Sequence, residues 1–418
     1  MNAVYRSKVP MPLLQTPQIP QTPTLPGVID ADIDAITAVT HPFPYSYYAE
    51  LASRQSMFRD HKNGLWIASR AAILEEIFKH PSCKVRPVAE PVPKALLGSA
   101  AADIFRHLVR MNDGAGHCPF KQAVSSTLQS LSIPQIEREG RRWAQHLATQ
   151  YYSNADDAWL DDFALQMPAY VVAGLLGAPA TALPDIALLM RNFVACLAAG
   201  SSAAQIAQGK QAAAALLAIF KPMLKEPGNS GLLSLLAQQA ALVGCDDAAV
   251  IAANGIGFMS QAYEATAGLI ANTLHVLAAD APLRQRVLRD PALLHACIDE
   301  VLRWDPPVQN TRRFVAADCE INGQAVRAGD TILLVLAAAN RDAAINPQPQ
   351  AFDVHRSQRR YFTFGNGVHV CPGQQLAVQI AHAAVAQLCR MELDFGRLAA
   401  AQKFRASANV RIRLYSAA

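Results

Sequence analysis

One long segment, Asp246–Ala279, constrains the fold more than any other part of this sequence. As a helix rising 1.5 Å per residue it would be about 34 residues and roughly 51 Å long. Asp246 and Asp247 suit its N-terminal cap and dipole. Because most of its faces are apolar, the helix must cross the middle of a large core. The 418 residues allow such a core, since 51% are hydrophobic and only 17% are charged.

Helical periodicity dominates elsewhere, for example over Ser69–His80 and Ile133–Ser153. Strand signals are few. They cover Phe314–Val326 with a turn at Asn322-Gly323, Thr331–Val335, and a terminal pair near Leu393–Phe395 and Val410–Leu414. The sequence therefore predicts a mainly α fold with small β-sheets.

The domain organisation follows from proline and linker content. Residues 1–26 contain six prolines, which fix φ and remove backbone donors, so we expect an extended arm over residues 1–30. No Gly/Ser linker or internal repeat interrupts the remainder, which favours a single domain over residues 31–418.

Charge and cysteine content exclude several classes of protein. Lys+Arg number 37 and Asp+Glu 33, a dispersed net charge of +4 that does not indicate nucleic acid. The eight cysteines form no CxxC pair, so neither a disulfide framework nor a zinc ribbon is indicated. No apolar run approaches the roughly 18 residues of a membrane span. We expect a soluble, cytoplasmic, monomeric protein without a signal peptide.

The stretch Phe362–Ala377, FTFGNGVHVCPGQQLA, carries the strongest chemical signal. Gly365 and Gly367 can take positive φ and let a flat ligand approach the backbone. Cys371 precedes a predicted helix, whose N-terminal N–H groups favour a thiolate and hence a metal ligand. The alternative is that Cys371 is one more buried thiol.

This stretch resembles the haem-binding loop of the cytochrome P-450 family. The matching positions are Phe364, Gly365, Gly367, His369, Cys371 and Gly373. The resemblance extends over nearly the whole chain from about Asp30. It implies a triangular helical fold that holds haem b between the long helix and the helix after Cys371. Cys371 would then bind the iron.

A second part of the resemblance is the pair Glu300 and Arg303, at i and i+3 on a predicted helix. Taken alone, such a pair is usually a solvated surface ion pair. In the family it is buried with a later arginine, here Arg356, and braces the cysteine loop.

The resemblance also implies partners for the haem propionates, which need cationic or donor groups. These would be His117, Lys121, Arg313 and His369. Lys121 stands where arginine is commoner, so a point charge replaces a bidentate fork. The alternative for Lys121 is a solvated surface charge.

The long helix contains Gln261-Ala-Tyr-Glu-Ala-Thr266. By resemblance Ala262 takes the usual glycine position, Glu264 is the acid that helps deliver protons to dioxygen, and Ala265 replaces the usual threonine. Thr266 or Gln261 would then hold the catalytic water, or a substrate hydroxyl does so, or ordinary oxygen scission is not the main task. Alternatively, the Thr266 hydroxyl bonds back to its own helix.

Pro372 has no N–H to give to the neighbouring sulfur. Fewer hydrogen bonds leave a more electron-rich thiolate, so we predict a lowered iron potential that favours O–O cleavage.

The resemblance implies the activity of a monooxygenase of biosynthetic or catabolic (secondary) metabolism. It would insert oxygen from O2 into a small to medium organic substrate of mixed polarity, anchored partly by Gln309, Asn310 and Thr311. Electrons would come from a separate ferredoxin and reductase. Arg359 and Arg360 would meet this carrier or stay solvated. Two alternatives remain: an atypical oxidase or peroxide-using enzyme, and a haem-binding sensor without turnover.

Overall fold

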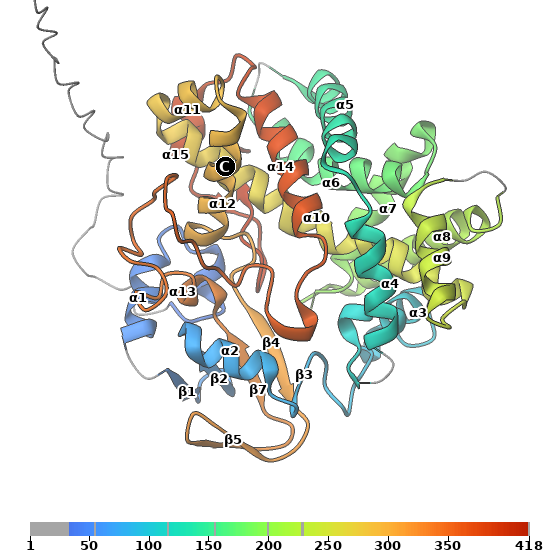
Figure 1. Cartoon of the computed structure of the whole chain (residues 1–418), viewed down its shortest axis with the longest axis vertical. Helices are drawn as coiled ribbons and strands as arrows, with labels where there is room; N and C mark the ends of the chain where they lie inside the picture. The colour runs from blue at the N-terminus through green and yellow to red at the C-terminus, as the bar shows by residue number, and fades with distance from the viewer. Residues whose placement is uncertain are drawn as a thin grey trace, which may run out of the picture.

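The structure is a computed structural model. It describes residues 33–53, 56–114, 117–153, 156–198, 200–226 and 230–416, without the side chain of Cys118. The predicted arm over residues 1–30 lies outside this part of the chain. Figure 1 shows a large helical part beside a smaller part built on a sheet. The predicted mainly α fold with small sheets is confirmed.

The helices are α1 Tyr45–Ser53, α2 Ala71–Lys79, α3 Ala100–His107, α4 Cys118–Gln129, α5 Ile133–Tyr151, α6 Trp159–Leu176, α7 Leu183–Ala195, α8 Ala203–Met223, α9 Leu232–Leu242, α10 Ala248–Ala279, α11 Ala281–Val287, α12 Pro291–Trp304, α13 Leu336–Ala339, α14 Gln374–Leu388 and α15 Phe395–Ala400. The predicted helices over Ser69–His80 and Ile133–Ser153 form as α2 and α5, and the structure adds helices that the sequence did not predict, such as α1, α6 and α15.

The long helix α10 forms as predicted. The Asp247 carboxylate accepts the Ala249 N–H at 2.7 Å and caps its first turn. The helix crosses the helical part and contacts α3, α6, α8, α9, α12 and α14 (Figure 1). Gly268 permits a close approach of the C-terminal segment, because a Cβ there would lie 2.7 Å from the Arg411 carbonyl oxygen. The central helix is therefore packed on nearly every side.

The main sheet has five strands in the order β1-β2-β7-β4-β3. Only β2 and β7 pair in parallel. The strands are β1 Met57–Asp60, β2 Leu65–Ala68, β3 Cys83–Lys84, β4 Thr311–Val315 and β7 Thr331–Leu334. A hairpin of β5 Cys319–Ile321 and β6 Gln324–Val326 turns at Asn322 and Gly323, whose φ angles are 50° and 70°.

The prediction for the terminal strands was partly wrong. Leu393–Phe395 is not a strand, because Asp394 accepts the Arg397 N–H at 3.0 Å and caps α15 instead. The partner of the last strand, β9 Arg413–Leu414, is β8 Lys403–Phe404.

Three clusters of buried apolar residues hold the molecule together: one among the helices, one between the sheet and α2, and one beneath α1. Within the described residues, no helix is long and apolar enough to cross a bilayer. Of the cysteines with described side chains, only Cys371 is exposed by area.

Candidate active site

The loop before α14 folds back on itself around Cys371. The Cys371 N–H donates to the Phe364 carbonyl at 2.9 Å, and the Gly365 N–H donates to Phe362 at 2.7 Å. Gly365 and Gly367 have φ angles of 72° and 69°, as the sequence predicts. A Cβ at Gly367 would lie 3.1 Å from the Phe78 carbonyl oxygen. Glycine is therefore required where the loop crosses α2.

Cys371 is an exposed residue, although protein surrounds its thiol closely enough to change the pKa of that group. Burial raises the pKa of this thiol, while the Gly373 N–H and the charge of Lys121 oppose the rise. The Gly373 N–H at the start of α14 thus acts on the thiol in the direction that the sequence predicts, while burial acts against it. A cation bound to the sulfur would reverse this balance.

Glu300 lies on α12 and is fully buried. Its Oε1 accepts from Arg303 Nη2 at 2.6 Å and from Arg356 Nε at 3.3 Å. The sequence reasoning missed a third guanidinium, Arg359, whose Nε lies 2.8 Å from Oε2. Arg359 is therefore neither solvated nor free to meet a carrier, whereas Arg360 pairs with Glu75 at 2.5 Å at the surface.

His117 and His369 lie side by side, with ring centroids 4.4 Å apart. His369 Nε2 lies 2.9 Å from Asp113 Oδ1, a partner that nothing in the sequence indicated. Two further ring nitrogens of the pair, His117 Nε2 and His369 Nδ1, are buried and have no hydrogen-bond partner among the described residues. Burial, and then the neighbouring His369, lower the pKa of His117 to about 4.

The two other predicted cations flank this pair. Lys121, on α4, donates from Nζ to the Val370 carbonyl at 2.7 Å and so reaches the cysteine loop. Arg313, on β4, is 6% exposed and lies over the Phe78 ring. Burial lowers the pKa of both side chains, and the nearby Asp113 partly offsets this for Arg313.

On α10 the predicted proton-delivering acid, Glu264, takes part in an ion pair. Glu264 lies 3.4 Å from Nη2 of Arg405, which follows β8 and was not predicted. Burial raises the pKa of Glu264, and Arg405 opposes the rise. Ala262 and Ala265 are half-buried. The Thr266 hydroxyl is buried and has no hydrogen-bond partner among the described residues, so the alternative, a bond back to its own helix, is not formed.

The predicted substrate anchors lie against the C-terminal loop. The Gln309 and Asn310 side-chain amides donate to the carbonyls of Pro306 and Ala408, at 2.6 and 2.9 Å. Their amide oxygens are buried and lack partners within the described ranges. Thr311 begins β4 and is half-buried. Gln261 donates to the Gly257 carbonyl at 2.8 Å and is exposed by area.

A model of the cytochrome P450 family, here written P-450, matches residues 244–391, which include α10, Glu300 and Cys371. The chain belongs to the cytochrome P-450 family. The 20-oxo-5-O-mycaminosyltylactone 23-monooxygenase of Streptomyces fradiae is 28% identical over 81% of this chain and 80% of its own length.

Solved structures agree in fold with this P-450. CalO2 has a TM-score of 0.76 at 23% identity and covers 91% of this chain and 95% of its own. CxnD, a cytochrome P-450 for C–S bond formation in chuangxinmycin biosynthesis, has a TM-score of 0.75 at 19% identity over 93% and 98%. The family is one of monooxygenases with a haem-thiolate cofactor.

The residues of this P-450 fit such a cofactor. A haem-thiolate cofactor needs a sulfur ligand for its iron, a backbone that its flat ring can approach closely, and partners for two propionates. The thiol of Cys371 and the glycine turns supply the first two. The unpaired ring nitrogens of His117 and His369, together with Arg313, supply the third.

Proposed function

We propose that this P-450 inserts one oxygen atom from O2 into a small to medium organic substrate of mixed polarity. Cys371 would bind the iron. When bound, haem supplies the activation of dioxygen with two electrons and two protons. The observation that carries the proposal is Cys371, an exposed residue in a glycine loop directly before α14, in a chain that also holds the buried Glu300 cluster on α12.

The α10 side chains would manage protons. Glu264 can hold and release a proton at its carboxyl, because burial raises its pKa above the ordinary value while Arg405 opposes the rise. The unbonded Thr266 hydroxyl can hold a water in place of the missing threonine hydroxyl at position 265. Proton delivery would thus be shifted by one residue along α10.

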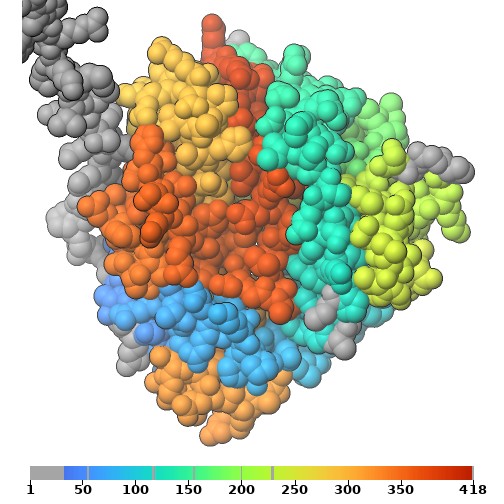
Figure 2. All heavy atoms as spheres, viewed as in Figure 1, coloured from blue at the N-terminus to red at the C-terminus, as the bar shows by residue number. Residues whose placement is uncertain are grey.

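Electrons would come from a ferredoxin-type donor. A surface hollow of about 430 Å³ lies beside the cysteine loop, between α4, α12 and α14. Figure 2 views the face where the orange-red α14 segment lies between teal α4 and golden α12. Uncharged side chains line most of this hollow, including Gln129, Gln375 and Gln379. The donor would therefore bind by hydrogen bonds and apolar contacts more than by charge.

The test is reconstitution of the haem-loaded enzyme with ferredoxin, reductase and NADPH over a substrate panel. We expect a haem-thiolate spectrum of the ferrous carbonyl adduct and a product one oxygen atom heavier. Cys371→His should keep haem but lose the thiolate spectrum. An unchanged spectrum in this variant would refute Cys371 as the ligand.

A second candidate is an atypical oxidase that couples or rearranges its substrate or uses peroxide. Ala265 in place of the usual threonine favours it, and CxnD, of the same fold, is described as forming a C–S bond. Turnover with peroxide alone, or a product without added oxygen, would favour this candidate. Ligand binding without any turnover would instead indicate a sensor.

A further inference from the structure

The two ends of the segment between β3 and α4 are joined beside the histidine pair. The Val85 N–H donates to Asp113 Oδ2 at 3.1 Å, and Arg86 Nη2 donates to Asn112 Oδ1 at 2.7 Å. The other oxygen of the Asp113 carboxylate, Oδ1, lies 2.9 Å from His369 Nε2. Arg86 therefore directly follows a residue that is bonded to the same carboxylate as His369, and its own side chain is bonded to the residue before Asp113.

The guanidinium of Arg86 has a partner on one side alone. Its Nη2 is bonded to Asn112, whereas its Nη1 is buried and has no hydrogen-bond partner among the described residues. Burial lowers the pKa of Arg86, and the charge of Asp113 opposes this effect. A buried donor on a charged group is costly when it lacks an acceptor. Nη1 of Arg86 thus needs an acceptor from outside the described chain.

Unpartnered nitrogens gather around Asp113. Besides Arg86 Nη1, they are His117 Nε2 and His369 Nδ1, both buried and without a hydrogen-bond partner in the described ranges. The two histidine rings lie 4.4 Å apart, and His369 contacts Asp113. Several such nitrogens at one place indicate a ligand that carries more than one acceptor atom.

The charges at this place also lack balance. The charge of Asp113 acts on both Arg86 and Arg313, and Lys84 adds a third cation near the same carboxylate. Asp113 already accepts from the Val85 N–H and contacts His369. One carboxylate cannot pair with all of these cations, and buried cations require anions. The two propionates of haem would supply two further carboxylates.

We propose that Arg86 is a further cofactor-binding residue, whose Nη1 donates to a haem propionate. Arg86 is not among the four propionate partners that the sequence resemblance implies. Asn112 would act as a positioning residue, because its Oδ1 holds Nη2 and so fixes the plane of the guanidinium. Such a role goes beyond the proposed function, since it concerns the retention of the cofactor and holds whichever substrate or reaction the enzyme serves.

Haem retention by the loaded protein tests this role. The rate of ferric haem transfer from this P-450 to apomyoglobin is measured with haem and with haem dimethyl ester, whose two propionates carry no charge. With haem, Arg86→Met should raise the rate of loss about tenfold or more. Arg86→Lys should raise it less, because the positive charge remains. With the ester, Arg86→Met should change the rate far less, because the charge that Arg86 would bind is gone.

The matched control is Arg106→Met, which removes an exposed arginine of the same segment that is paired with Asp103. It should match the wild type with both cofactors. Unchanged haem loss in Arg86→Met would overturn the proposal. An equal rise with haem and with the ester would also overturn it, since Arg86 would then support only the fold of the segment. The ferrous carbonyl spectrum is recorded for each haem-loaded protein. A wild type without a haem-thiolate spectrum would refute the proposed function itself, which distinguishes the two failures.

Discussion

At the scale of single residues, two opposing effects set the ionisation of Glu264. Burial raises its pKa and Arg405 lowers it. Arg405→Met removes the lowering effect, so the pKa should rise further and less carboxylate should exist at any given pH. The acid limb of the pH profile for product formation should therefore shift to higher pH.

Arg405→Lys is the matched control, because it keeps a positive charge at the same place. Its profile should stay closer to that of the wild type, measured as the initial rate of NADPH-coupled product formation. If Arg405→Met and Arg405→Lys give the same profile as the wild type, Glu264 does not limit proton delivery.

The second prediction concerns Pro372, which offers the sulfur no N–H. In the structure the Gly373 N–H is a hydrogen-bond donor to Cys371. Pro372→Leu and Pro372→Ala each restore an N–H and should raise the iron potential, because an added hydrogen bond withdraws charge from the thiolate. Spectroelectrochemical titration measures the shift. An unchanged potential in both variants would contradict the prediction.

These residues also show what the sequence can and cannot predict. The Cys371 loop could be recognised because its glycines, its histidine and its cysteine lie within one short stretch of the sequence. Arg405 and Arg359 were missed because their carboxylate partners lie 141 and 59 positions away, and only folding brings them together. The lack of a hydrogen bond at Thr266 depends on local packing of α10, which no periodic pattern encodes.

At the scale of elements, α12 carries Glu300, and three arginines meet on this one carboxylate. Arg359 and Arg360 are adjacent in the sequence but have different surroundings. The Arg359 side chain is 13% exposed and bonded to Glu300, while that of Arg360 is 55% exposed and bonded to Glu75. Arg359→Gln should lower the free energy of unfolding by about 3 kcal/mol. Arg360→Gln should change it by less than about 0.5 kcal/mol.

Urea unfolding of the haem-loaded variants measures both values. Similar losses for the two variants would mean that the Glu300 cluster adds little to stability. A selective loss of ferredoxin-driven reduction in Arg360→Gln, with stability intact, would show that Arg360 meets the electron carrier.

The same carboxylate makes stability depend on pH. Burial alone would raise the pKa of Glu300, but hydrogen bonds and charge from Arg303, with Asp353 N–H and Arg359, hold it below its ordinary value. Its contribution is therefore complete above the unfolded pKa of about 4.3 and is lost as pH falls through the lower folded pKa. Glu300→Gln should flatten this acid dependence in unfolding curves taken below about pH 5. An equally steep curve would assign the dependence to other groups.

The elements themselves differ in how predictable they were. The α10 helix could be predicted from the sequence, because an apolar segment of this length can be accommodated only as a helix buried in the core. The segment near Leu393 has a strand-like composition, yet Asp394 caps a short helix there. A local side-chain hydrogen bond thus overrides β-propensity where the segment is short.

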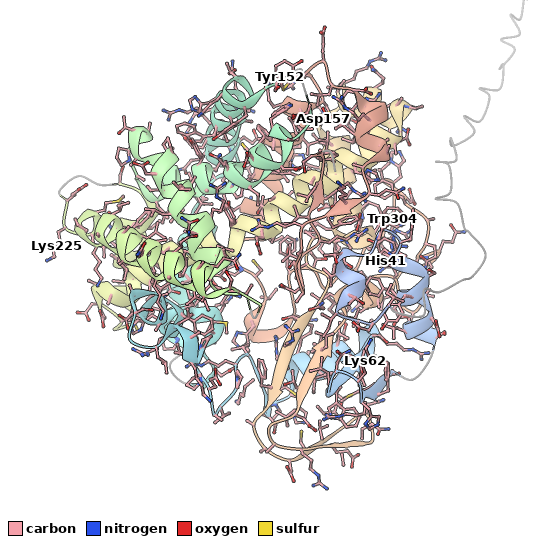
Figure 3. All side chains as sticks on the ribbon, turned by 180° about the vertical axis from the view of Figure 1, so that it is seen from behind. His41, Lys62, Tyr152, Asp157, Lys225 and Trp304 are labelled. Carbon is pink, nitrogen blue, oxygen red and sulfur yellow. The ribbon has the colours of Figure 1, made fainter. Side chains whose placement is uncertain are left out.

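At the scale of the whole molecule, one arginine ties the two ends of the described chain together. Arg411 is 1% exposed and donates to the carbonyls of Val39, His41 and Pro42 at 2.9, 2.8 and 3.3 Å. Its Nε also bonds Asp305 at 3.1 Å, at the end of α12. Figure 3 shows His41 close to Trp304 on this side of the molecule. The first segments therefore depend on the last strand.

Such a tie predicts that residues 33–416 unfold as one unit. Arg411→Met leaves the buried Asp305 carboxylate with a hydrogen bond from the Tyr45 hydroxyl and with one more distant cation, Arg413 at 4.0 Å. It should lower stability by about 3–5 kcal/mol. Because Arg411 joins segments some 370 positions apart, the loss should appear throughout the molecule. Tryptophan fluorescence and the haem absorption band should then shift to lower urea together, in a single transition for wild type and variant. If the variant instead shows an early fluorescence change while the haem band stays at the wild-type midpoint, the sheet part and the helical part are separate folding units.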